Sequence, residues 1–267
     1  MIRRRLDAEL VRRGLAGSEE EAREAVLAGR VTVGGRPLSA PTTMVSSEEP
    51  VVVSAVRERV VSRGGWKLDA GLTRLGIDPE GRDALDAGAS TGGFTERLLR
   101  GGARRVVAVD VGYGQLAWQL RSDERVTALE RTNVRTLRPE DLPFVPDLIV
   151  ADLSFVSLAS VVPALARVAS ANADLVLLVK PQFEADRGDV GPGGVVADPA
   201  VWRRSIERVS TALRRCGIAP IAVCVSPLLG PAGNVEFLLH AKVGPDEGGG
   251  PVRGVDGAIA EGKALRR

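Results

Sequence analysis

The stretch DALDAGASTGGFTERLLRGGARRVVAVDVGY, residues 83–113, decides the fold of this chain. Its first apolar residues predict a short strand that stops at Asp86, and the glycines of residues 88–93 predict a tight loop after it. Residues 95–100 have helical spacing and end at two glycines, and residues 105–109 form a second, β-branched run. The order strand, glycine loop, helix, strand predicts a unit that can hold an adenosyl cofactor.

The chemistry of the loop separates the possible ligands. Phe94 follows the paired glycines where a phosphate-binding loop would have lysine and serine or threonine, and the G-x-G-x-x-G pattern of dinucleotide sites is absent. Asp86 would repel a pyrophosphate but suits a cationic sulfonium or amino group. Asp110, after the second strand, can accept hydrogen bonds from both hydroxyls of a ribose. These residues favour S-adenosylmethionine over NAD; a β–α turn that binds nothing is the alternative.

Apolar strands and amphipathic helices alternate over residues 63–243. This alternation predicts an α/β domain with a doubly wound, mostly parallel sheet that is closed by a hairpin-like pair of strands. We expect a helix to start at Lys67. We also expect a linker over residues 57–62 and a flexible tail over residues 244–267, with a short terminal helix from Ala258.

Four charged residues end predicted strands of this domain: Asp86, Asp110, Asp152 and Lys180. Ligands of parallel α/β sheets bind beyond the carboxyl ends of the strands. We therefore expect all four side chains to point into one crevice.

Lysine usage draws attention to Lys180. The 36 basic residues include only four lysines, which are Lys67, Lys180, Lys242 and Lys263. Lys180 ends the apolar run VLLV, where desolvation favours the neutral amine, and a neutral lysine can act as a base whereas an arginine cannot. A purely structural pair with Asp152 is the alternative.

Composition excludes several classes of site. The 267 residues have a formal net charge of +2, so overall charge favours no class of partner. Cys216 and Cys224 are the only cysteines, which indicates reduced core thiols, and His240 is the only histidine. We therefore expect no metal site and no histidine-based triad.

Hydropathy predicts a cytoplasmic protein. No apolar run approaches the roughly 18 residues that a membrane-spanning helix needs. The arginines at the N-terminus are not followed by the apolar stretch of a secretory signal.

Residues 1–56 read as a separate small α+β module. Residues 7–13 predict a short helix, the capping box that begins at Ser18 predicts a second helix over residues 19–28, and residues 31–33 begin a hairpin. Positive charge gathers on one edge, which suits phosphate binding; solvated helix faces are the alternative. The arginines of that edge are Arg3, Arg4, Arg5, Arg12, Arg13 and Arg30.

The stretch RRRLDAELVRRGLAGSEEEAREAVLAGRVTVGGRPL resembles the S-four-type RNA-binding domain, named after a small-subunit ribosomal protein. It departs from that pattern at Glu19, where a basic residue is common. The motifs GGWKL, LDAGASTGGFT, AVDVGYGQL, ADLSF, LVKPQFE and GNVEF together resemble the TlyA family over nearly the whole chain. A second departure is Val60, where that family usually has an aromatic residue.

The resemblance implies a Rossmann-like class I S-adenosylmethionine-dependent methyltransferase domain of FtsJ type behind an S-four-type RNA-binding domain. Members of the family methylate the 2′-hydroxyl of cytidines in small- and large-subunit ribosomal RNA, which affects sensitivity to capreomycin-type antibiotics. The implied partners are therefore ribosomal RNA and ribosomal subunits, and we expect a monomer.

Motifs and resemblance together assign roles to individual residues. The implied catalytic tetrad is Lys67, Asp152, Lys180 and Glu236. The expected S-adenosylmethionine contacts are Asp86, Gly88, Ala89, Ser90, Thr91, Gly92, Gly93, Asp110, Val111, Asn133 and Asp152. The expected RNA contacts are Arg3, Arg4, Arg5, Arg12, Arg13, Arg30 and Arg63.

Other activities are less consistent with the residues. Enzymes that methylate a base amine have prolines at the positions after Asp152, where this chain has Leu-Ser-Phe. Methylation of cytosine C5 requires a nucleophilic cysteine in the crevice, and we expect Cys216 and Cys224 to lie elsewhere. Two alternatives stay open: a haemolysin, a name that some members of the family carry, and a non-catalytic RNA-binding assembly factor.

Overall fold

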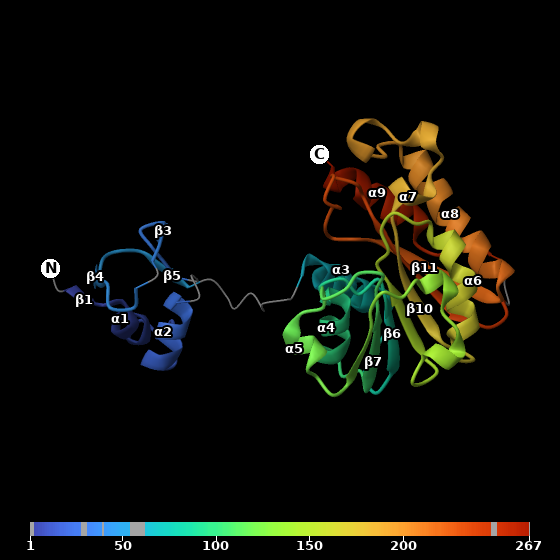
Figure 1. Ribbon diagram of the computed structural model, residues 1–267. Coiled ribbons are helices and arrows are strands. Elements are labelled where there is room, and N and C mark those ends of the chain that lie inside the picture. Colours follow the sequence, from blue (N-terminus) through green and yellow to red (C-terminus); the bar gives the residue numbers. More distant parts are fainter. Residues whose placement is uncertain (1–2, 28–30, 39, 54–61, 247–249, 267) are drawn as a thin grey trace. The chain divides into compact units, whose positions relative to one another are not determined.

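The computed structural model describes residues 3–27, 31–38, 40–53, 62–246 and 250–266. The chain forms two compact units, Met1–Arg59 and Val60–Arg267 (Figure 1). The linker expected over residues 57–62 spans this division, and only Ser62 of it lies within the described residues.

The first unit packs two helices against short strands. Its elements are β1 (Arg3–Arg5), α1 (Leu6–Arg12), α2 (Glu19–Leu27), β2 (Val31–Val33), β3 (Arg36–Pro37), β4 (Met44–Ser46) and β5 (Val51–Val53). β1 pairs with β4, and the other strands form a sheet in the order β3-β2-β5. The predicted cap of α2 is present, because the Glu21 amide donates to Ser18 Oγ at 3.1 Å. Leu6, Leu10 and Val26 are fully buried between the elements.

The second unit is built on one sheet of seven strands. They are β6 (Asp83–Ala87), β7 (Arg105–Val109), β8 (Val126–Leu129), β9 (Leu148–Ala151), β10 (Asp174–Val179), β11 (Ile218–Val225) and β12 (Phe237–Val243). Their order is β11-β12-β10-β9-β6-β7-β8, and only β12 runs antiparallel to its neighbours. The predicted α/β class with a mostly parallel, doubly wound sheet is confirmed.

Helices cover both faces of this sheet. They are α3 (Arg63–Leu75), α4 (Gly93–Arg100), α5 (Trp118–Arg121), α6 (Leu158–Val168), α7 (Pro181–Glu184), α8 (Pro199–Arg215) and α9 (Val255–Leu265), with 3₁₀ turns at Val134–Thr136, Pro139–Asp141, Arg187–Asp189 and Pro192–Gly194. Figure 1 shows α3, α4 and α5 on one side of the sheet and α6 and α8 on the other. Strand residues alternate between the two cores: Leu85 packs towards α6 and α8, whereas Ala84 packs towards α3 and α4.

Two expected boundaries are wrong. α3 begins at Arg63 rather than at Lys67, because Ser62 caps it by accepting a hydrogen bond from the Gly64 amide at 3.2 Å. The terminal helix expected from Ala258 is present as α9, but it begins at Val255, and the tail expected to be flexible packs here, since Ala258 and Ile259 are buried in the core with α6 and α8. No helix in the described parts of the chain is long and apolar enough to cross a membrane.

Candidate active site

The glycine loop after β6 is shaped by close contacts that exclude side chains. Gly88 has a φ of +88°, and a Cβ there would lie 2.7 Å from the carbonyl oxygen of Asp152. Gly92, with a φ of +102°, precedes α4 and packs against Leu120. Only glycine adopts these conformations without strain, so the loop brings backbone amides to the end of β9.

A first cavity, of about 540 Å³, lies beyond the carboxyl ends of β7 and β9. Asp110, Val111 and Asn133 line it. The Asp110 carboxylate is fixed, because Oδ2 accepts from the Ser90 amide at 2.8 Å and Oδ1 from the Gly112 amide at 2.7 Å. A carboxylate held at this position fits the ribose hydroxyls of an adenosyl group.

A second cavity, of about 440 Å³, adjoins the first. Lys67, Lys180 and the loop residues Ala89, Thr91 and Gly93 are in its lining. The residues that line both cavities are Gly88, Ser90, Asp152 and Ser154. A ligand that extends from one cavity into the other would therefore pass Asp152.

Lys180 lines the second cavity, next to the residues that line both, and is almost buried. β10 ends at Val179 and α7 begins at Pro181, so Lys180 occupies the junction. Its Nζ lies 2.6 Å from Asp152 Oδ1 and donates to Ser154 Oγ at 3.0 Å. The predicted pairing of Lys180 with Asp152 is thus present, and it orients the amine at the cavity wall.

The other two tetrad residues form a second ion pair. Lys67 Nζ lies 2.5 Å from Glu236 Oε2, and the two side chains are 9% and 1% exposed. Glu236 Oε1 has no hydrogen-bond partner among the described residues. Glu236 therefore lies behind Lys67, since Lys67 lines the second cavity and Glu236 does not.

Asp86 lies beneath the loop and lines neither cavity. It is fully buried, and its Oδ2 accepts from Thr95 Oγ1 at 2.7 Å while Oδ1 has no partner among the described residues. Burial, reinforced by the nearby carboxylates of Asp152 and Asp110, raises the pKa of Asp86 to about 7. Its expected contact with a cationic ligand group stays a prediction, as does that of Gly92, which also lines neither cavity.

Sequence reasoning missed two residues of the segment that follows β9. Ser154 lines both cavities and holds Lys180. Phe155 is 92% exposed with a φ of +64°, borders the first cavity and has its ring 5.4 Å from that of Phe183. The motif ADLSF contains both residues, but its spacing alone does not show that the chain turns here to expose a ring.

Glu184, the last residue of the motif LVKPQFE, was also missed as a supporting residue. It is buried and accepts hydrogen bonds from Ser157 Oγ at 2.6 Å and from the Leu158 amide at 2.5 Å. Burial raises the pKa of Glu184. The carboxylate therefore caps α6 and ties the residues after Lys180 to those after Asp152.

The arginines expected to bind RNA fall into three groups. Arg63 lines the second cavity and donates to the Leu229 carbonyl at 3.1 Å. In the first unit, Arg5 pairs with buried Asp7. Buried Glu9 has three arginines within ion-pair distance, which are Arg4, Arg12 and Arg13. Arg3 lies 3.9 Å from a carboxylate oxygen of Glu49. Arg30 lies outside the described residues.

Arg13 differs from the other arginines in being structural. Its side chain is only 18% exposed and donates to the backbone carbonyls of Ser46, Ser47 and Glu49. Its guanidinium is therefore occupied within the unit.

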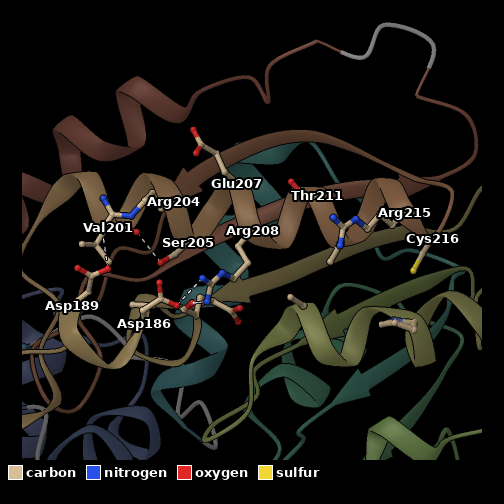
Figure 2. Close-up of a pocket in the computed structure, with 15 residues that line it drawn as sticks. Asp186, Asp189, Val201, Arg204, Ser205, Glu207, Arg208, Thr211, Arg215 and Cys216 are labelled. Atoms are coloured by element: carbon tan, nitrogen blue, oxygen red, sulfur yellow. Dashed lines mark hydrogen bonds and ion pairs between the residues drawn. The ribbon is translucent and has the colours of Figure 1, made fainter.

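A third cavity, of about 620 Å³, lies along α8 and has none of the expected site residues in its lining (Figure 2). Figure 2 shows Arg204 and Arg208 reaching from α8 towards Asp189 and Asp186, which they meet at 2.8 Å and 2.9 Å. These pairs tether the segment after α7 to α8. The lining of this cavity has four carboxylates, of Glu184, Asp186, Asp189 and Glu207, and three guanidinium groups, of Arg204, Arg208 and Arg215.

The described residues contain no group of three or more histidine, cysteine, aspartate or glutamate side chains that could hold a metal ion.

Comparison with known proteins agrees with this geometry. The model of the FtsJ-like methyltransferase family matches residues 60–243, and that of the S4 domain matches residues 4–51. The 16S/23S rRNA (cytidine-2'-O)-methyltransferase TlyA of Mycobacterium tuberculosis is 54% identical over 245 residues, which cover 91% of this chain and 91% of that protein.

Solved structures extend the comparison. One described as "Putative hemolysin from Streptococcus thermophilus" is 33% identical, covers 99% of this chain and 97% of its own, and has a TM-score of 0.74. A "putative S-adenosylmethionine dependent methyltransferase from Listeria monocytogenes", 14% identical over 66% of this chain and 99% of its own, shares the fold with a TM-score of 0.50. Hemolysin names thus occur within one family. The chain belongs to the TlyA family of FtsJ-like methyltransferases, with an S4 domain before its methyltransferase domain.

Proposed function

We propose that the protein transfers a methyl group from S-adenosylmethionine to the 2′-hydroxyl of a cytidine in ribosomal RNA. The observation that carries the proposal is the position of Lys180, held by Asp152 where the two cavities meet. The M. tuberculosis relative is named for this reaction on 16S and 23S rRNA, and we propose the same substrate class here.

The residues present fit S-adenosylmethionine. Asp110 supplies the acceptor for the ribose hydroxyls, and Val111 and Asn133 line the same cavity where the adenine would lie. The backbone of residues 88–93 would hold the methionine end in the second cavity, since Ala89, Thr91 and Gly93 line it. The methyl donor would then extend past Asp152.

When bound, S-adenosylmethionine supplies an electrophilic methyl group on a sulfonium. The protein must align a hydroxyl with it and take up one proton. Lys180 in its neutral form accepts the proton of the 2′-hydroxyl at Nζ, and Asp152 stabilises the resulting ammonium through the contact at 2.6 Å. Ser154 fixes the direction of the amine.

The Lys67–Glu236 pair has a positioning role in this proposal. Because both side chains are nearly buried and Lys67 faces the second cavity, its ammonium can donate to an oxygen of the target ribose. Glu236 holds Lys67 in place through their contact at 2.5 Å.

The proposed RNA contacts come from both units. Exposed Phe155, held against Phe183, offers a flat ring on which the target base can stack beside the first cavity. The partly exposed arginines of the S4 domain, Arg3, Arg4, Arg5 and Arg12, can contact phosphates. We propose that the protein acts as a monomer on ribosomal subunits in the cytoplasm.

The test is transfer of tritiated methyl from S-adenosylmethionine to unmodified 30S and 50S subunits. Lys180→Met is expected to lower the rate by about 100-fold or more, because the base is lost, with little change in S-adenosylmethionine affinity. Lys242→Met, at an exposed lysine, is the matched control. Transfer at a near wild-type rate by Lys180→Met would overturn the mechanism. Cofactor binding without transfer to either subunit would favour the assembly-factor alternative.

A further inference from the structure

Two aromatic side chains stand out on the surface beside the site. The chain has only nine aromatic residues, three Trp, one Tyr and five Phe. Tyr113 is nevertheless 67% exposed and Trp118 is 78% exposed. Both lie in the segment after β7, beyond the carboxyl edge of the sheet, and neither lines the cavities described above.

Glu130 and Arg131 join these two residues into one surface. The Arg131 guanidinium carbon lies 4.3 Å from the centroid of the Tyr113 ring. Glu130 accepts from the Gly114 amide at 2.9 Å and pairs with Arg121 of α5, the helix that begins at Trp118. We call Tyr113, Trp118, Arg121 and Arg131 the Tyr113 patch.

The charge of the patch favours an anionic partner. Arg121 is balanced by Glu130, whereas Arg131 is found in no ion pair within the described residues. The surface therefore combines exposed rings with an uncompensated cation. Stacking rings beside guanidinium groups are what binds unpaired nucleotides, whose bases have flat faces and whose backbone is anionic.

The patch is continuous with the proposed cofactor cavity. Val111 and Gln115, which flank Tyr113 and Gly114, both line that cavity, and the Ser90 hydroxyl lies 3.4 Å from Gln115 Oε1. An RNA strand that places a ribose at Lys180 has further nucleotides on either side of it. Because Val111 and Gln115 place the patch beside the first cavity, we expect these further nucleotides to reach it.

We propose that the Tyr113 patch binds unpaired nucleotides of the RNA substrate next to the target. Bases stack on Tyr113 and Trp118, and Arg131 contacts a phosphate. The proposal rests on RNA being the substrate of the proposed function, but it assigns RNA binding to a surface of the methyltransferase domain that is separate from the catalytic lysines and from the S4 domain.

Trp118 provides a direct probe. Fluorescence is followed while single-stranded oligocytidylate, and separately purified 30S or 50S subunits, are added to the full-length protein. Stacking of a base on Trp118 is expected to quench its emission, and a Trp118→Phe variant, which keeps a stacking ring, is expected to lose the quench but retain the affinity.

Alanine variants test the energetics. Tyr113→Ala, Trp118→Ala and Arg131→Ala are each expected to weaken RNA binding by about tenfold, with unchanged S-adenosylmethionine affinity and unchanged kcat at saturating RNA. Arg131→Ala should also reduce the salt dependence of binding by about one phosphate contact. Val145→Ala, a 59% exposed residue before β9 at the opposite edge of the sheet, is the matched control.

The outcomes separate this proposal from the proposed function. Methyl transfer by the wild type together with wild-type RNA affinity in all three alanine variants would overturn the patch and leave the function standing. Weakened RNA binding in these variants without any methyl transfer by the wild type would support the patch and overturn the function. A change of sedimentation coefficient in Trp118→Ala, without loss of RNA affinity, would identify a protein interface and overturn the patch.

Discussion

Lys180 and Lys67 show how single residues make this site. Each lysine is nearly buried, and each touches one carboxylate at 2.6 Å or less. A buried charge is tolerated only with such a partner, so each pair can contribute both to the stability of the fold and to the reaction. Substitutions can measure these contributions to stability and to activity separately.

The Lys67–Glu236 pair permits that separation. Lys67→Met is expected to destabilise the protein by about 3–5 kcal/mol, because it leaves the Glu236 carboxylate buried without a counter-charge. Lys67→Met combined with Glu236→Leu is expected to recover most of that stability and none of the activity. Urea unfolding gives the first quantity and methyl transfer the second. Recovery of activity in the double variant would show that the pair is structural only.

Asp86 should make stability depend on pH. Its pKa is about 7 in the folded chain against an ordinary aspartate value of 3.8, so between these two pH values the folded state holds a proton that the unfolded state has released. The stabilisation from the neutral carboxyl is complete below about pH 4 and is lost as pH rises through 7. Asp86→Asn resembles the neutral form.

The cofactor-free Asp86→Asn protein should therefore gain stability over wild type as pH rises from 5 to 8, by about 3 kcal/mol. Denaturant unfolding at the two pH values measures the difference. An equal difference at both values would mean that Asp86 does not titrate in this range.

Ser154 tests the orientation of Lys180. Ser154→Ala removes the hydroxyl that accepts from Nζ at 3.0 Å but leaves Asp152 in place. We expect kcat to fall by about fivefold to tenfold, as for one lost hydrogen bond, with KM for RNA unchanged and partial rescue by Ser154→Thr. A higher KM for RNA together with an unchanged kcat would mean that Ser154 contacts the RNA instead.

Some of these residues were predictable and others were not. Asp110, Asp152 and Lys180 each follow an apolar run, so their place at a strand end could be predicted from the pattern alone. The roles of Ser154 and Phe155 depend on a turn with positive φ after β9, and no periodicity reports such a turn.

At the scale of elements, α6 depends on a residue from another helix. Glu184 of α7 accepts from Ser157 Oγ and from the Leu158 amide at the first turn of α6. Since Lys180 precedes α7 and Ser154 precedes α6, this carboxylate holds together the two segments that we propose to be catalytic. Glu184 thus caps α6 from outside that helix, in place of the usual side chain just before its first turn.

Glu184→Ala is expected to destabilise the protein by about 2–3 kcal/mol, because it removes two acceptors from a buried helix start. It should also lower kcat by loosening the Lys180–Ser154 contact. Glu207→Ala, at an exposed carboxylate of α8, is the control. Thermal unfolding and methyl transfer are measured on both. Unchanged stability in Glu184→Ala would mean that water or another group caps α6 equally well.

The strands of the sheet were predicted more accurately than the structure of the last residues of the chain. The strands of the methyltransferase domain are apolar runs between turn signals, and these are readable in a sequence. The terminal helix was predicted, but its packing into the core was not, because α9 packs through small residues. A Cβ at Gly262 would lie 2.9 Å from Val235 and 3.3 Å from Trp202, so close approach, rather than apolar content, holds the helix.

At the scale of the whole molecule, the chain has two units, each with its own hydrophobic core. The methyltransferase domain contains every residue proposed to act on the methyl donor or the ribose. The S4 domain contributes charge, but buried Asp7 and Glu9 hold several of its arginines in defined places, which composition could not reveal. The account as a whole depends on which atom of the RNA receives the methyl group.

The most direct measurement of that claim is the position of the transferred methyl on the nucleoside. RNA labelled by the wild-type protein is hydrolysed with alkali, which needs a free 2′-hydroxyl to cleave the chain, and the products are separated. We predict that the label resides in alkali-resistant dinucleotides whose 5′ nucleoside is 2′-O-methylcytidine. Label in mononucleotides that carry a methylated base would contradict the proposed role of Lys180.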